Sequence, residues 1–262
     1  MKRGLLLFAL AALSLSTSAA AQTLDQAISD LRAGAYESAI EALGEISRSD
    51  PEPNLSQGDR RRAYVAYLSA LAEVGRYEEA LEAVSQAPPA IVTELANTAG
   101  EILYELGQID RAREQFARSV EGGAMDRNSA RLNLAIIEWR YGDRDAAFAA
   151  FDSFIDLYNG STPLSSTDLT AVATAVQYLG IREHELFQDA LRAYDEAVAA
   201  DPGSLEPRIL IGELFLDKYN GPEADAAMKE VLARNPNHPR ALLGLARAMK
   251  FNGTVGVMDQ VE

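Results

Sequence analysis

The 262-residue sequence contains no cysteine, two histidines and a single tryptophan. Without cysteine, the chain cannot form a disulfide, a thiolate nucleophile or a Cys-ligated zinc or iron–sulfur site. Two histidines leave little from which to build a hydrolytic zinc site. Basic residues are also scarce, with 24 Lys and Arg against 39 Asp and Glu, so the formal net charge is −15. Because such a surface repels phosphate backbones, nucleic acid is not an expected partner.

The motifs that would mark an enzyme active site are also missing. There is no G-x-x-x-x-G-K-[ST] phosphate loop, no G-x-G-x-x-G fingerprint and no G-x-S-x-G nucleophile elbow. His184 and Glu185 begin like a zinc-protease helix, but Gln188 stands where the second histidine would be. We therefore expect no catalytic residue, no metal site and no cofactor, and we expect His184 to lie in an exposed turn.

The first 21 residues are typical of a cleaved export signal. A basic start is followed by a short apolar run over residues 4–13, and Ala19-Ala20-Ala21 has the small-residue pattern of a cleavage site before Gln22. The run is shorter than the roughly 20 residues that a helix needs to span a bilayer. The sequence predicts an exported protein, periplasmic or secreted, with no transmembrane segment after signal cleavage. If the signal were not cleaved, residues 4–13 would instead form an anchor.

The rest of the sequence repeats one helical pattern six times. In each copy an alanine is followed four residues later by a larger apolar residue, and most copies have a glycine shortly before the alanine. We expect this glycine to form the turn between the paired helices, in a conformation that residues with a Cβ atom resist. The alanines stand at positions 39, 80, 112, 147, 190 and 224, in steps of 41, 32, 35, 43 and 34 residues. Apolar residues three and four apart indicate amphipathic helices, and no run alternates as a strand would. The sequence therefore predicts an all-α chain of paired helices.

This pattern resembles the tetratricopeptide repeat family, whose helix–turn–helix unit has a period of 34 residues. Ala99-Gly100 and Ile211-Gly212 match the small positions of the first helix in that family. The resemblance implies an α-solenoid of tandem repeats wound into a right-handed superhelix. It divides the chain into a signal peptide (1–21), repeats 1–4 (22–160) and repeats 5–7 (161–262), the last of them incomplete.

The resemblance also implies where a partner would bind. In this family the first helix of each pair lines the concave surface, and the shared register places one set of side chains from repeats three and four there. These candidate groove residues are Asn97, Glu101, Tyr104, Asn133, Ile136, Trp139 and Arg140. Tyr104 and Trp139 hold the same register position, which predicts neighbouring rings on the groove wall or, alternatively, rings packed between repeats. The clamp with which some members hold a C-terminal carboxylate is not reproduced, so we do not expect capture of a chaperone tail.

Two functions remain open from the sequence. The first is a non-enzymatic, exported scaffold that binds a peptide or protein partner in its concave groove. The alternative is the N-terminal repeat arm of a larger secreted enzyme, such as an HExxH metallopeptidase whose catalytic domain is not in this chain. Residues 217–247 are similar to repeat arms of that kind. A module for small ligands has no sequence support beyond the groove itself.

The seventh repeat is incomplete in this sequence. A first helix is expected from Pro239, but only the short apolar segment 255–262 follows it. Terminal repeats need a polar outer face, because an open end leaves apolar surface uncovered. We therefore expect loose packing of 255–262, and either a longer polypeptide or another chain that covers the end. The exposed residues expected to favour self-association are Leu243, Leu245, Met249 and Phe251.

Overall fold

In the computed structural model of this chain, residues 19–48, 55–160 and 163–251 are described. All regular secondary structure in these ranges is helical. The helices are α1 (Ala19–Arg32), α2 (Tyr36–Arg48), α3 (Gln57–Glu73), α4 (Tyr77–Gln86), α5 (Val92–Glu105), α6 (Ile109–Glu121), α7 (Arg127–Tyr141), α8 (Arg144–Tyr158), α9 (Ser166–Leu179), α10 (Leu186–Ala200), α11 (Glu206–Asp217), α12 (Gly221–Leu232) and α13 (Pro239–Phe251). Residues 1–18 of the expected signal peptide (1–21) and the segment 255–262 lie outside the described residues, whereas residues 19–21 belong to α1.

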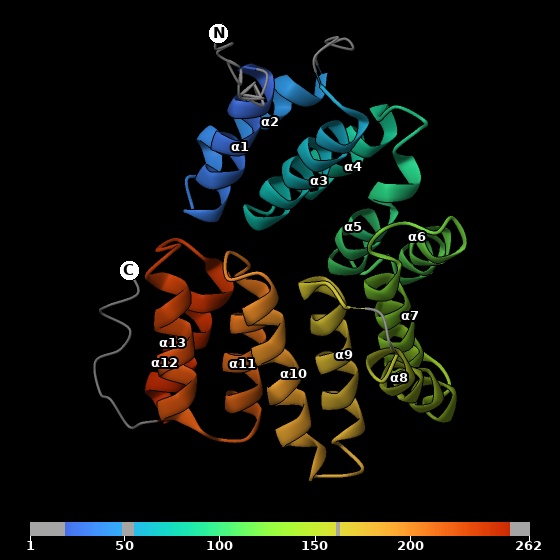
Figure 1. Cartoon of the computed structure of the whole chain (residues 1–262), viewed down its shortest axis with the longest axis vertical. Helices are drawn as coiled ribbons and strands as arrows, with labels where there is room; N and C mark the ends of the chain where they lie inside the picture. The colour runs from blue at the N-terminus through green and yellow to red at the C-terminus, as the bar shows by residue number, and fades with distance from the viewer. Residues whose placement is uncertain (1–18, 49–54, 161–162, 252–262) are drawn as a thin grey trace, which may run out of the picture.

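The helices form hairpins that stack side by side (Figure 1). Each odd-numbered helix contacts the even-numbered helix that follows it and also the next odd-numbered helix, from α1 through α13. The odd-numbered helices, which are the first helices of the repeats, therefore make one continuous layer, and each second helix packs against the first helix of its own repeat and that of the next. This arrangement confirms the predicted all-α solenoid.

The small residues of the repeat lie where neighbouring helices approach most closely. The alanines that mark the repeat, Ala39, Ala80, Ala112, Ala147, Ala190 and Ala224, all have 0% of their surface exposed. A Cβ atom added at Gly100 would lie 2.5 Å from the ring of Phe116, and one at Gly212 would lie 2.6 Å from the Cε atom of Met228. The core is thus a chain of clusters between successive hairpins rather than one centre.

Glycine makes the turn in the first three hairpins but not in the fourth or sixth. Gly34, Gly75 and Gly107 have φ angles of +80°, +76° and +71°, which residues with a Cβ atom resist. Gly142, expected to play the same part, has a φ angle of −132°, and the Asp143 carboxylate instead caps the first N–H groups of α8. In the sixth hairpin Tyr219 takes the positive φ angle, 57°. The expectation of a glycine turn is therefore wrong at these two hairpins.

The two ends of the described solenoid meet, which the sequence analysis did not predict. The turn between α1 and α2 lies against the link between α12 and α13 (Figure 1). The Asn235 side-chain amide donates a hydrogen bond to the Tyr36 hydroxyl at 2.9 Å, and the Asn237 amide donates one to the Gly34 carbonyl at 3.2 Å. These polar contacts close the arc of hairpins into a ring.

Candidate binding cavity on the inner face

The ring surrounds a central cavity with a volume of about 570 Å³. Its wall comes almost entirely from α3, α5, α7, α9, α11 and α13, the first helices of repeats two to seven. The concave surface that the family resemblance implied is therefore present, and the first helices of six repeats contribute to one shared cavity. We call this space the central cavity.

Four of the seven candidate groove residues line the central cavity together. Asn97 and Glu101 lie on α5, and Asn133 and Ile136 lie on α7. The Asn133 amide donates to Asn97 Oδ1 and to Glu101 Oε1, each at 3.2 Å, and the Asn97 amide donates to the same Glu101 oxygen at 3.0 Å. Two asparagines on adjacent helices thus hold the Glu101 carboxylate in a defined position.

The other three candidate residues, Tyr104, Trp139 and Arg140, do not line the central cavity. The Tyr104 ring packs edge-on against Tyr141, with centroids 6.5 Å apart, and the Trp139 ring packs against Tyr178, with centroids 5.4 Å apart. Arg140 lies among these rings: burial would lower its pKa, but the neighbouring tyrosines keep the pKa above its usual value. Tyr104 and Trp139 are thus placed as rings that pack between helices, which was the alternative interpretation.

Carboxylates dominate the charged groups of the central cavity. The acidic residues that line it are Glu73, Glu101, Glu105, Asp126 and Glu206. Arg240 is the one basic residue among the described lining residues. Its guanidinium is already paired, at 2.8 Å with Glu206 and at 2.9 Å with Glu213. The cavity therefore carries a net negative charge.

Enclosure raises the pKa values of several of these acids. Burial is the main cause that raises the pKa of Glu101 to about 7, and repulsion from Asp126 and Glu206 acts in the same direction. Burial also raises the pKa of Glu73 and of Asp126. The Glu101 side chain nevertheless remains accessible to water within the cavity. The cavity thus gains negative charge as the pH rises through neutrality, at a carboxylate that a ligand can reach.

The sequence analysis missed the contribution of Glu73, Glu206 and Arg240. These residues belong to repeats two, six and seven, and the register was mapped only onto repeats three and four. Because every first helix faces the same space, extending that mapping to all repeats would have pointed to them. In the described ranges, no cluster of three or more His, Asp and Glu side chains is placed to hold a metal ion. No described helix is long and apolar enough to cross a membrane.

Comparison with sequence families decides the classification. The profile described as tetratricopeptide repeat matches residues 24–91 and 97–162, slightly more than half of the chain. The chain belongs to the tetratricopeptide repeat family. The match covers α2, α3, α4, α6, α7 and α8 in full and most of α1 and α5, and it indicates no catalytic family. The helices beyond it continue the same repeat packing through α13.

Several solved structures are similar to this chain at low sequence identity. The Cut9–Hcn1 hetero-tetramer of the APC/C gives a TM-score of 0.48 at 18% identity over 88% of this chain and 43% of that one, so this chain spans less than half of its length. PilF of Pseudomonas aeruginosa gives a TM-score of 0.47 at 16% identity, and the alignment covers 89% of this chain and 97% of PilF. The TPR2AB domain of yeast Sti1 in complex with pHSP90 gives a TM-score of 0.36 at 16% identity, and the alignment covers 92% of this chain and 89% of that chain. No curated protein sequence matches the chain.

Proposed function

We propose that this tetratricopeptide repeat protein is a non-enzymatic, exported scaffold that binds a peptide or protein segment in its central cavity, and that the bound segment carries lysine or arginine side chains. The observation that carries the proposal is the composition of the cavity wall. Five carboxylates face the space, and the one lining arginine is held by two glutamates. A ligand that brings positive charge would satisfy groups that the protein itself leaves in mutual repulsion.

The size and chemistry of the central cavity fit a short segment of polypeptide. A volume of about 570 Å³ is enough for a few side chains, and it lies in the range of roughly 300–1,000 Å³ that is typical of ligand sites. Asn97 and Asn133 carry both donors and acceptors, so they can bond the main chain of a bound segment as well as Glu101. A cationic side chain beside Glu101 would lower the pKa of its carboxyl and thereby favour the charged form.

The two other parts of the proposal have their own support. Family membership and the lack of phosphate-loop and nucleophile motifs support a non-enzymatic role. Export is supported by the signal pattern over residues 1–21. N-terminal sequencing of the protein recovered from the envelope or medium should give Gln22 or a residue close to it, and an intact Met1 would contradict export by this route.

The ligand preference can be tested with three labelled peptides that differ only in one repeated residue, lysine, glutamine or glutamate. At physiological ionic strength, fluorescence anisotropy should show binding of the lysine peptide at least about tenfold tighter than of the other two. Glu101→Gln should weaken binding of the lysine peptide several-fold. The matched control is Glu114→Gln, which removes the same charge from an exposed position on α6. Equal losses in both variants, or equal affinity for all three peptides, would contradict the proposal.

We also propose that the C-terminal end of the described solenoid favours self-association. On α13, the Leu243 side chain is 62% exposed and Phe251 is 48% exposed, whereas Leu245 and Met249 are half-buried. Sedimentation velocity should show a concentration-dependent species that is reduced in Leu243→Gln. A monomer at all concentrations would contradict this expectation.

A further inference from the structure

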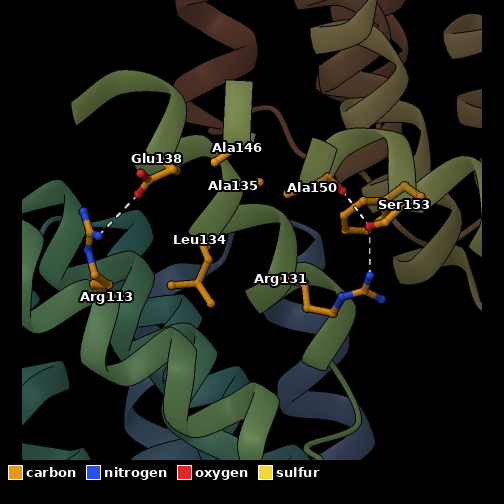
Figure 2. A pocket seen from close by; sticks show the side chains of 9 residues that line it. Arg113, Arg131, Leu134, Ala135, Glu138, Ala146, Ala150 and Ser153 are labelled. Atoms are coloured by element: carbon orange, nitrogen blue, oxygen red, sulfur yellow. Dashed lines mark hydrogen bonds and ion pairs between the residues drawn. The ribbon is translucent and has the colours of Figure 1, made fainter. Parts of the chain in front are cut away.

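A second cavity, of about 340 Å³, lies on the opposite side of α7 from the central cavity, between α6, α7 and α8 (Figure 2). We call it the outer notch. The side chains that define it are Arg113 from α6, Arg131, Leu134 and Glu138 from α7, and Ala146 and Ala150 from α8. Figure 2 shows Leu134 between the two arginines, with Ala146 and Ala150 above it in this view. None of these residues lines the central cavity, so the notch is a separate surface.

The outer notch is open because α8 presents small side chains to it. Ala146 and Ala150 are one turn apart, whereas the large side chains Phe148 and Phe151 on the same helix are buried in the neighbouring core. Together with Leu134, the two alanines make an apolar floor that is accessible to solvent. The floor has room for an aliphatic side chain.

Arg131 is held in one place by neutral groups. Its guanidinium donates to Asn128 Oδ1 at 3.0 Å and to Ser153 Oγ at 3.0 Å, and it stacks over the Phe154 ring at 5.1 Å from the centroid. Ser153 in turn donates to the Ala150 carbonyl at 2.6 Å, as the dashed lines in Figure 2 show. Within the described residues, no carboxylate forms an ion pair with Arg131. The notch therefore holds a preorganised cation whose charge is not compensated.

The second arginine is only partly engaged. Arg113 pairs with Glu138 at 3.3 Å, and 45% of its side chain is exposed. Glu138 also accepts a hydrogen bond from the Asp143 N–H at 2.8 Å, so its charge is shared with the turn before α8. Two arginines and one glutamate leave the outer notch with a net positive charge, in a chain whose formal net charge is −15.

The positive charge of the outer notch is not repeated at every equivalent position of the solenoid. The corresponding cavity two repeats earlier, between α2, α3 and α4, has a volume of about 410 Å³. It is lined by Arg48 but also by Glu78, Glu79 and Glu82, so its net charge is negative. Equivalent positions in the solenoid thus carry opposite charge.

We propose that the outer notch binds a protein segment that presents an aspartate or glutamate carboxylate beside an aliphatic side chain. The carboxylate binds the free side of the Arg131 guanidinium and is also attracted by Arg113, while the aliphatic side chain lies over the apolar floor. Because the arginine is already held by Asn128, Ser153 and Phe154, little side-chain entropy is lost on binding. This site is independent of the central cavity and takes a ligand of opposite charge.

The test uses short helical peptides in which one Leu-x-x-Glu unit is compared with Leu-x-x-Gln and Leu-x-x-Lys. The full chain is titrated with each peptide, and the arginine Nε–Hε signals are followed by NMR. The Glu peptide should shift the signals of Arg131 and Arg113, leave that of Arg48 unchanged, and bind at least about tenfold tighter than the other two. Loss of this selectivity, or equal shifts at Arg48, would overturn the proposal.

Two variants distinguish the contribution of the Arg131 charge from that of the open space over the apolar floor. Arg131→Gln should weaken the Glu peptide at least about tenfold. Ala150→Leu should weaken it by a similar factor, because it fills the floor while both arginines remain. Arg48→Gln, in the corresponding cavity, is the matched control and should change nothing. Thermal unfolding checks that each variant is folded; unchanged binding in a folded Ala150→Leu variant would overturn the proposal. A concentration-dependent shift of Arg131 without peptide would also overturn it, by identifying a second copy of this chain as the occupant.

Discussion

The two sides of α7 differ in charge although the residues that form them are only a few positions apart. Asn133 and Ile136 face the central cavity, where carboxylates prevail, whereas Arg131 and Leu134 face the outer notch, where arginines prevail. A helical period of 3.6 residues places residues two apart on different faces, so each set can vary without the other. In a solenoid one helix therefore serves two surfaces. The net charge of the whole chain is a poor guide to what either surface binds.

The largest effect is expected from the core that supports both surfaces. Phe116, with 1% of its surface exposed, packs in the cluster that contains Ile137 of α7. Phe116→Ala should lower the free energy of unfolding by about 3–5 kcal/mol. Thermal unfolding followed by circular dichroism should show a midpoint lower by on the order of 10 °C, with both peptide affinities reduced together. Phe116→Leu should cost clearly less, and an unchanged midpoint for the alanine variant would contradict this packing.

The second effect concerns the independence of the two surfaces. Glu101→Gln should weaken the lysine peptide and leave the Glu peptide unchanged, and Arg131→Gln should do the reverse. The double variant should show the two losses unchanged, because sites without shared partners are additive within about 0.5 kcal/mol. Anisotropy titrations of the unmodified protein, the two single variants and the double variant with both peptides give the complete double-mutant cycle. Coupling clearly above that limit would mean that α7 transmits an effect between its faces.

A smaller effect is expected from pH, and again at one surface only. Because the Glu101 pKa is raised to about 7, its carboxyl is mostly protonated near pH 6 and mostly ionised near pH 8. The lysine peptide should therefore bind several-fold tighter at the higher pH, whereas binding of the Glu peptide at the notch should change little. The folded pKa of Glu101 lies above the ordinary glutamate value of 4.5, so the stability that this group contributes is present in full below pH 4.5 and is lost as the pH rises through about 7. In Glu101→Gln the pH dependence of lysine-peptide binding should become much flatter. If the affinity of that variant changed with pH as steeply as that of the unmodified protein, other acids would be responsible for the pH dependence.

The features that the sequence predicted well are local or periodic. Ala39 and its five counterparts are buried because each hairpin needs a small residue at its closest contact, and this need recurs in every repeat. The family resemblance, applied to the same register, implied that Asn97, Glu101 and Asn133 share one wall, because first helices line the concave surface in that family. Where a repeat departs from the pattern, as with Tyr219 in the turn before α12, the periodic interpretation was wrong.

The main features that the sequence did not predict depend on small geometric changes that accumulate over many repeats. Asn235 meets Tyr36 across 199 residues because small rotations between successive hairpins add up to a closed ring, and no short pattern encodes that sum. The enclosure that raises the Glu101 pKa has the same origin. The outer notch exists because Ala146 and Ala150 are small residues on the exposed side of α8. Alanine is common in helices, so these two positions do not stand out in the sequence.

The smallest effect is expected at Trp139, which belongs to neither surface. Its ring packs against Tyr178, and the Arg144 guanidinium lies 5.2 Å from its centroid. Because this is the only tryptophan, its fluorescence reports this contact alone. We expect an emission that is already blue-shifted in the free protein and that changes little with either peptide, while Trp139→Phe keeps both affinities. An emission change that saturates with the lysine peptide but not with the Glu peptide would instead place Trp139 at the groove, as its register position first suggested. The wall of the inner site would then extend beyond the central cavity toward the end of α7.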